Sequence, residues 1–365
     1  MTHETDHQQR AIQLWLFAVA ALVLAMVLVG GATRLTESGL SITEWQPVFG
    51  VVPPLNDGAW QVAFAKYRAI PQYRELNAGI SLAAFKSIFW WEWAHRLLGR
   101  LIGVAFIVPF LWFLWCGDVP PPLRGRLWFI FALGALQGVV GWWMVASGLA
   151  ERVEVSQYRL ATHLILACTI YVALIWTALG LTKRKTTPVP WRIGAGAIGL
   201  LVLVLMQIYL GALVAGLRAG YVYNTWPLID GTLLPSNARL FFHAPLWRNF
   251  FENALTVQFD HRMLAYLIWI SAGLHALDAV SSGRRGLTGA VLLFGALTLQ
   301  FALGIWTVLL VAPLPLSFAH QAMAMVALTI ATVHAARVFL ATQGARAGDG
   351  AGLAIHTAGG ANERQ

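Results

Sequence analysis

Long stretches of the chain contain no charged residue, and several are long enough to cross a membrane as a helix. A helix that crosses a hydrocarbon core of about 30 Å needs roughly 20 apolar residues, and strands of a β-barrel would instead alternate polar and apolar side chains. The charge-free stretches lie between Arg10 and Arg34, Arg126 and Glu151, Arg159 and Lys183, Arg192 and Arg218, and Arg285 and Arg337. The pattern predicts eight transmembrane helices, at about 12–32, 89–115, 127–147, 158–181, 193–216, 257–280, 287–311 and 316–340.

Composition agrees with an integral membrane protein and predicts its orientation. Of the 365 residues, 58% are hydrophobic and 11% are charged, which is too little polar surface for a water-soluble globule. We interpret the net charge of +9 as a topology signal rather than as nucleic-acid binding, because basic residues gather in cytoplasmic loops. The short connections carry Arg124, Arg126, Lys183, Arg184, Lys185, Arg192, Arg284 and Arg285. Both termini are therefore expected in the cytoplasm, and the long connections 33–88 and 217–256 on the outer side.

An internal repeat divides the chain into two halves. The segments LQGVVGWWMV (136–145) and LQFALGIWTV (299–308) match in register. Further matched pairs, in the same order, are Gly31 with Gly211, Gly39 with Gly220, and Trp45 with Trp226. Four spans separate equivalent points, so both repeats have the same orientation across the membrane. The sequence predicts an all-α membrane protein of two pseudo-symmetric four-helix bundles, with a cytoplasmic N-terminus at 1–11, bundles at 12–185 and 186–341, and a disordered cytoplasmic tail at 342–365.

Four histidines occupy equivalent places near the start of the second and fourth spans of each half. They are His95 and His163 in the first half, and His261 and His320 in the second. Ionisable side chains inside a membrane are costly and usually face a functional site. No cysteine or carboxylate completes a zinc or non-haem iron set in each half, whereas two facing imidazoles suit the axial positions of a haem. The pattern favours one haem pocket per half over the alternative of four hydrogen-bonded packing residues.

The two halves differ beside these histidines. Glu92 precedes His95 by three residues, on nearly the same helix face, whereas the second half has Gln258 at that place. A carboxyl group in such a pocket acts as a general base or stabilises a developing cation, so the first half is the candidate reaction chamber and the second a candidate electron-transfer site. The alternative is that Glu92 pairs with an arginine. Arg96 and Arg262 are candidate partners of haem propionates, or else extend to the membrane surface.

Two more histidines follow the second-half pair at a spacing of 14 residues, at His275 and His334. Fourteen residues are close to four helical turns, about 21 Å, a spacing that allows a bundle to stack two haems. The first half has Pro109 and Thr177 at these positions. From the sequence alone we favour the other interpretation, that these imidazoles reach water or stabilise helix ends at the cytoplasmic side.

Several segments together resemble haem A synthase in its proteobacterial and mitochondrial form. They are GGATRLTESGLSITEWQPVFGVVPP, WWEWAHRLLGRLIG, YRLATHLILA, NTWPLIDG, FDHRMLAY and FAHQAMAM, and the resemblance covers about residues 12–340. Members of that family oxidise the C8 methyl group of haem O to the formyl group of haem A, which is delivered to haem-copper terminal oxidases. The formyl oxygen comes from water in the mechanism described for the family.

The resemblance implies roles for individual residues. His95 and His163 are expected to flank the substrate haem O, with Glu92 as the essential acid. His261 and His320 are expected to ligate a haem b cofactor through which electrons leave. The Gram-positive branch of the family has a cysteine pair in its first outer loop, which this chain lacks. An electron route through thiols of that loop is therefore not expected.

The resemblance also implies a bacterial inner-membrane protein with its haem sites toward the periplasm. Haem O synthase, cytochrome oxidase assembly factors and a second copy of the chain are candidate partners. The alternative function is a non-catalytic, two-haem, cytochrome b-like electron carrier. A carboxylate in only one pocket, at Glu92, favours the enzyme, because a carrier has no need of it. A transporter of parallel repeats is a weaker alternative, since buried charges near the membrane midplane are missing from the pattern.

Overall fold

The computed structural model describes residues 2–47, 49–182, 189–282 and 288–359, with side chains described from residue 6 to residue 341 within these ranges. Eight of the described helices are long and apolar enough to cross a membrane, which confirms the predicted all-α membrane class. They are α1 (Thr2–Leu35), α4 (Leu82–Trp115), α5 (Pro121–Ala146), α6 (Gln157–Gly180), α7 (Trp191–Gly216), α11 (Ala254–Ser281), α12 (Thr288–Leu309) and α13 (Leu314–Gly359).

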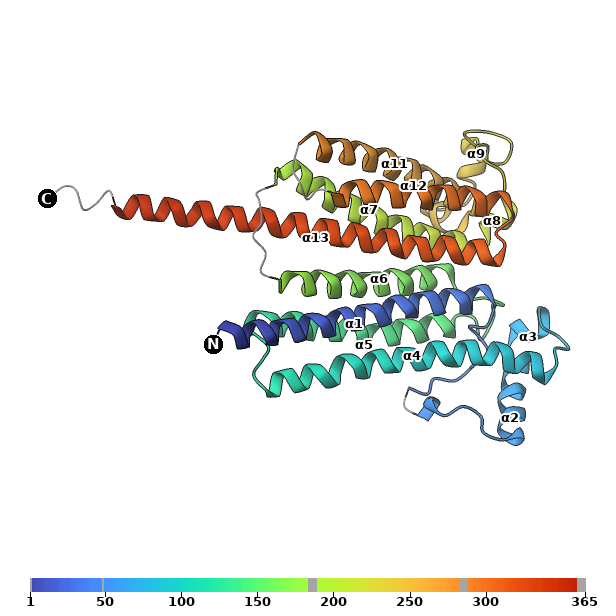
Figure 1. Ribbon diagram of the computed structural model, residues 1–365. Helices are drawn as coiled ribbons and strands as arrows, with labels where there is room; N and C mark the ends of the chain where they lie inside the picture. The colour runs from blue at the N-terminus through green and yellow to red at the C-terminus, as the bar shows by residue number, and fades with distance from the viewer. Residues whose placement is uncertain (1, 48, 183–188, 283–287, 360–365) are drawn as a thin grey trace.

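The long helices form two groups of four (Figure 1). In the first group, α1 packs against α4 and α6, and α5 packs against the same two helices. In the second group, α7 packs against α11 and α13, and α12 packs against the same two. The second and fourth helix of each group are therefore diagonally opposite, α4 across from α6 and α11 across from α13. The same pairings recur in both halves, while the pseudo-twofold relation between the halves stays a prediction.

The connections between the long helices lie at two opposite ends of the molecule. The start of α1, the connection between α4 and α5 and the end of α13 lie at one end, and the two long connections lie at the other (Figure 1). Three of the basic residues that predict the orientation lie in the described part of the chain: Arg124, Arg126 and Arg192. They lie at the end of the molecule that holds the termini. The remaining cations of that signal lie outside the described residues: Lys183, Arg184, Lys185, Arg284 and Arg285.

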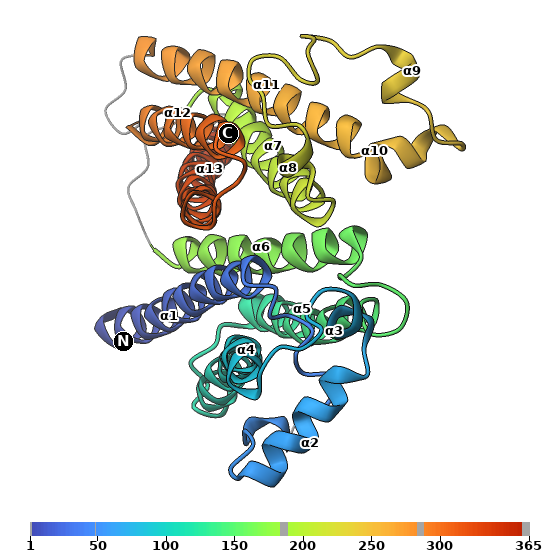
Figure 2. The ribbon, with the colours of Figure 1, turned by 90° about the vertical axis from the view of Figure 1, so that its right-hand side faces the viewer.

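The two long connections lie at the end opposite to the termini, and both contain short helices (Figure 2). The first connection contains η1 (Phe49–Val51), α2 (Asp57–Arg68) and α3 (Pro71–Glu75). The second contains α8 (Ala219–Val222), α9 (Asn237–Leu240), η2 (Leu246–Arg248) and α10 (Asn249–Glu252). Side-chain caps fix some of these starts, for example Asn56, whose carboxamide oxygen accepts a hydrogen bond from the backbone N–H of Ala59.

The first and last of the long helices, α1 and α13, are longer than the hydrophobic pattern predicts. α1 begins at Thr2 rather than near residue 12, and α13 continues to Gly359, whereas the sequence predicts disorder from residue 342. Adding residues to an existing helix needs no new nucleus, so these polar segments continue a helix that the apolar span has already started. The hydrophobic pattern marks where a span lies in the membrane, and it carries no signal for where the helix itself ends.

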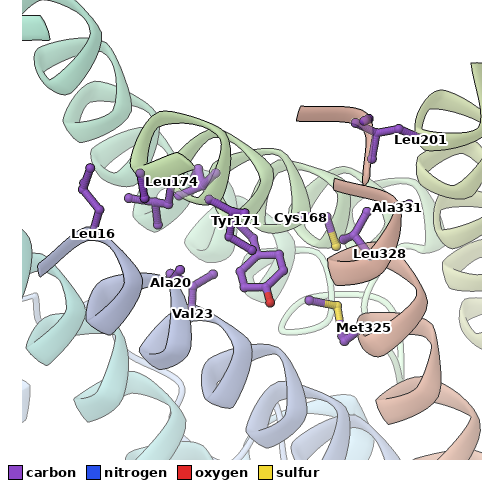
Figure 3. Packing of buried hydrophobic residues seen from close by; sticks show 14 of the residues in the cluster. Leu16, Ala20, Val23, Cys168, Tyr171, Leu174, Leu201, Met325, Leu328 and Ala331 are labelled. Carbon is purple, nitrogen blue, oxygen red and sulfur yellow. The ribbon is translucent and has the colours of Figure 1, made fainter. Parts of the chain in front are cut away.

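One buried apolar cluster joins the two halves. It includes residues of α1, α6, α7 and α13, drawn in Figure 3 with Leu16, Tyr171, Leu201 and Leu328 among the labelled side chains. Within it, the hydroxyl groups of Tyr171 on α6 and Thr329 on α13 are 2.7 Å apart. The predicted division at residue 185 falls among residues 183–188, outside the described part, and stays a prediction.

Candidate functional site

Each of the four predicted haem histidines lies against a glycine of a neighbouring helix. A Cβ atom at any of these glycines would be only 2.9 to 3.2 Å from Cε1 of the imidazole. A side chain there would collide with the ring, so glycine allows the helix backbone to approach the imidazole and limit its movement. The pairs are Gly30 with His95, Gly141 with His163, Gly211 with His261, and Gly304 with His320.

These contacts correct one pair of the sequence repeat. The residue equivalent to Gly211 is Gly30, not Gly31, because Gly30 contacts a histidine of the next helix as Gly211 does. A separation of 181 residues also relates the other two matched pairs of this region. Two consecutive glycines made the alignment ambiguous in the sequence. Gly31 has a different contact: a Cβ atom there would overlap the side chain of Gln321, which donates from Nε2 to the carbonyl oxygen of Val27 at 2.8 Å.

Three of the four histidines also have a glutamine partner, four residues before the contacting glycine. Gln137 Nε2 donates to the carbonyl oxygen of His163 at 3.0 Å and lies 3.2 Å from its Nδ1. The other two contacts are Gln207 Nε2 to His261 Nε2 at 3.3 Å and Gln300 Nε2 to His320 Nε2 at 3.4 Å. The signal is visible in the sequence as the repeated segments QGVVG, QIYLG and QFALG, but these glutamines were not among the predicted site residues.

His95 is the exception to this pattern. The residue equivalent to the glutamine is Met26, in the segment MVLVG. The first half therefore differs from the second at two places beside its histidines, in the acid at Glu92 and in the missing glutamine. Both differences concern α4 and the helix that packs on it.

The paired histidines of each half fit the axial positions of a haem. They come from diagonally opposite helices, α4 and α6 in the first half and α11 and α13 in the second. Within the described part of the chain, Nδ1 of His95, His261 and His320 is buried without a hydrogen-bond partner. A buried polar atom in that state is unfavourable, and neutral imidazole nitrogens are the common haem ligands in helical bundles. The residues present thus suit a bis-histidine haem in each half.

Glu92 lies beneath the first outer connection, where its side chain is 2% exposed. Arg96 Nη2 donates to Oε1 at 2.5 Å. Ser41 Oγ and the backbone N–H of Ile42 donate to Oε2, at 2.7 and 2.6 Å. All three neighbours are donors, so both oxygens accept, as those of an ionised carboxylate do. The predicted pairing with an arginine is present, while the contact of Glu92 with a haem pocket stays a prediction.

Arg96 and Arg262 bind backbone carbonyl groups of the outer connections. Arg96 donates to the carbonyl oxygens of Ile42 at 2.6 Å and Glu44 at 2.8 Å. Each arginine thereby holds the outer connection of its own half over the helix end. The two roles expected from the sequence, binding of haem propionates and extension to the membrane surface, did not include this one. Such contacts join residues that are far apart in the chain, so the periodicity within one helix does not predict them.

The second half repeats this arrangement with an uncharged side chain in place of the acid. Arg262 donates to Gln258 Oε1 at 3.0 Å, to the carbonyl oxygen of Tyr223 at 3.0 Å and to that of Leu228 at 3.2 Å. Gln258 also donates to the carbonyl oxygen of Ala219 at 3.3 Å. The arginine contact is thus common to both halves, and the negative charge belongs to the first half alone. Binding of haem propionates by the two arginines stays a prediction.

Alanine at Gly304 is expected to weaken haem binding in the second half. Its Cβ atom would lie 3.0 Å from His320 Cε1, and overpacking of this kind costs about 1–3 kcal/mol, which exceeds the gain of up to about 1 kcal/mol from replacing a helical glycine. We expect haem content after purification to fall and the bis-imidazole absorbance to shift. Gly295→Ala on the same helix is the control, because nothing lies within 4 Å of its Cβ position. Equal haem content in both variants would contradict the steric role of Gly304.

Comparison with known proteins gives matches along most of the chain. Residues 13–332 match the COX15-CtaA family, described as cytochrome oxidase assembly protein. The chain is 60% identical over 330 residues to "Heme A synthase" of Rhodopseudomonas palustris strain HaA2, which covers 90% of each chain. It is 60% identical over 331 residues to that of Bradyrhizobium diazoefficiens, covering 90% of this chain and 92% of the relative, and 57% identical over 330 residues to that of Bradyrhizobium sp. strain ORS 278, covering 90% and 91%. The chain therefore belongs to the COX15-CtaA family of cytochrome oxidase assembly proteins.

Proposed function

We propose that this chain is a haem A synthase, which oxidises the C8 methyl group of haem O to the formyl group of haem A. Relatives that carry this name are 57–61% identical over about 90% of the chain. The observation that carries the proposal is the difference between two otherwise matching sites. Both halves have a histidine pair, contacting glycines and an arginine at the helix end, but among the described residues the side chain that this arginine contacts one turn earlier is a carboxylate, Glu92, in the first half and an uncharged amide, Gln258, in the second.

In the proposed reaction the first half binds the substrate. His95 and His163 flank haem O, and Gly30 and Gly141 limit the movement of their rings. The isoprenoid tail of the substrate suits entry from the lipid between the helices. Oxidation of a methyl group in successive steps, with water supplying the formyl oxygen, develops positive charge at the methyl carbon.

Glu92 is the proposed catalytic carboxylate of this half. Its two oxygens already accept hydrogen bonds from three donors, which hold the carboxyl group in one position beneath the first outer connection. This supports stabilisation of the developing cation over removal of a proton, because a fixed charge in a buried site needs no reorganisation during the reaction. Ser41, Ile42 and Arg96 are positioning residues that hold the carboxylate in place.

The second half is the proposed cofactor site, with His261 and His320 as ligands of haem b. When bound, haem b accepts electrons from the oxidation and passes them to an external acceptor. Gln207 and Gln300 lie beside the two imidazoles, with their Nε2 atoms 3.3 and 3.4 Å from Nε2 of His261 and His320, and iron bound at these ring nitrogens would replace the two amide contacts. Arg262 holds the second outer connection over this site.

The proposed location is the bacterial inner membrane, with both termini in the cytoplasm and both haem sites toward the periplasm. Arg124, Arg126 and Arg192 lie at the end of the molecule that holds the termini, in agreement with the excess of basic residues in cytoplasmic loops. Haem O synthase is the proposed source of the substrate, and cytochrome oxidase assembly factors are the proposed recipients of the product.

Identification of the bound pigments tests the proposed function. The chain is produced together with a haem O synthase and purified in detergent, and its pigments are extracted and identified by mass. We expect haem b together with haem O and haem A. Haem b alone, with haem O left unconverted in the same membranes, would contradict the enzyme and support the electron carrier. Membranes without the chain provide the baseline for haem A.

A further inference from the structure

The second half contains another pair of facing histidines, His275 on α11 and His334 on α13. Their Nε2 atoms are 2.9 Å apart, and their ring centroids are 5.2 Å apart at an interplanar angle of 65°. Both side chains are buried, at 8% and 4% exposed. Since α11 and α13 are diagonally opposite, the two imidazoles meet inside the bundle and not at a contact between adjacent helices. This differs from the water-facing or helix-end position that we favoured from the sequence.

Glycines of the two remaining helices contact these imidazoles. A Cβ atom at Gly196 of α7 would lie 2.7 Å from Nδ1 of His275, and one at Gly289 of α12 would lie 2.6 Å from Nδ1 of His334. Each of these glycines precedes the glycine of the outer pair by 15 residues, and each histidine follows its outer counterpart by 14. The second half therefore contains the same set of two histidines and two glycines at two levels, one for each end of the bundle.

The first half provides an internal comparison, because it has neither histidine nor glycine at the four equivalent positions. They are occupied by Trp15, Pro109, Arg126 and Thr177. Trp15 donates from Nε1 to the carbonyl oxygen of Ala105 at 2.8 Å and packs on Phe110. The inner level of the first half is thus filled by large side chains. The glycine and histidine set is consequently a property of the proposed electron-transfer half alone.

We propose that His275 and His334 are the axial ligands of a second haem in the second half. Metal–imidazole bonds are about 2 Å long, so binding of the iron replaces the hydrogen bond between the Nε2 atoms and requires them to separate by about 1 Å. The two haems would lie about 21 Å apart along the helix axes, four turns from each other. This goes beyond the proposed function, which uses a single haem in that half, and it extends the electron path toward the end that holds the termini.

The test counts haem b in purified protein in which the first half is unable to bind haem. In a His95→Ala, His163→Ala background we expect two haem b per chain, by pyridine haemochrome and protein assay, and two low-spin components in a redox titration. Adding His275→Ala and His334→Ala should remove one haem and one component. One haem b per chain in the background, unchanged by the inner substitutions, would overturn the proposal and leave the two imidazoles as a hydrogen-bonded pair.

A smaller substitution tests the inner site without removing the histidines, so that loss of haem through misfolding can be recognised. Gly196→Ala inserts a methyl group against His275 and should lower the inner haem content, whereas Gly199→Ala on the same helix has nothing within 4 Å of its Cβ position and should not. Equal haem content in the two variants would count against the site. Haem A formation is measured separately, with the first half intact: two haem b in the background variant but no haem A from the unmodified chain would contradict only the proposed function, and haem A from the unmodified chain with one haem b in the background variant would contradict only this inference.

Discussion

Replacement of Glu92 by glutamine is expected to lower haem A formation by about 100-fold or more while haem stays bound. Loss of one fixed group that stabilises developing charge typically costs about 10²–10³ in rate. Glutamine has nearly the same shape, and Gln258 makes the same arginine contact in the second half, so we expect the fold to persist. The measurement is the ratio of haem A to haem O in extracts of membranes that contain equal amounts of each variant.

Glu75→Gln is the matched control for this prediction. Glu75 lies exposed at the end of α3 in the same outer connection as the donors to Glu92, and the substitution removes the same charge. We expect haem A formation close to that of the unmodified chain. Normal haem A formation by Glu92→Gln would remove the carboxylate from the mechanism. Loss of bound haem together with activity would instead show that Glu92 mainly holds the outer connection in place.

Alanine at His261 or His320 is expected to abolish the bis-imidazole absorbance of haem b and, with it, sustained haem A formation. The iron would lose one of its two axial ligands. Reduced-minus-oxidised spectra of the purified variants measure the first effect, and pigment extraction measures the second. The control is His243→Ala in the second outer connection, where the contact with Asn249 is made by the backbone N–H. Retention of the full spectrum by either histidine variant would contradict its role as a ligand.

The hydrophobic pattern predicted the helices well because lipid imposes a simple requirement. A span must be apolar over most of its length, so the hydrophobic pattern locates all eight long helices, including α4 and α11, which contain charged residues. The pattern failed at the ends of α1 and α13, where helices continue beyond the apolar segment. The repeat also predicted that the four histidines lie on the second and fourth helices of each half, because equivalent residues keep their spacing within a span.

Contacts between distant segments were beyond the reach of the sequence. The donors to Glu92 at Ser41 and Ile42 are 51 and 50 residues away in the chain, and no periodicity relates a loop to the helix that it covers. The glycine contacts were different, since the QxxxG segments repeat visibly. They became interpretable only when the structure placed each glycine against a histidine of another helix.

The shared apolar core between the halves has a consequence for the proposed oxidation. Side chains of α1, α6, α7 and α13 interlock in one cluster, and packed interiors resist compression and hinge motion. The gap that an electron must tunnel across between the two halves is therefore set by the fold and stays nearly constant during turnover. The rate of that transfer then depends on the difference in reduction potential between donor and acceptor, so variants that tune the potential of the second site should alter it without any change in spacing.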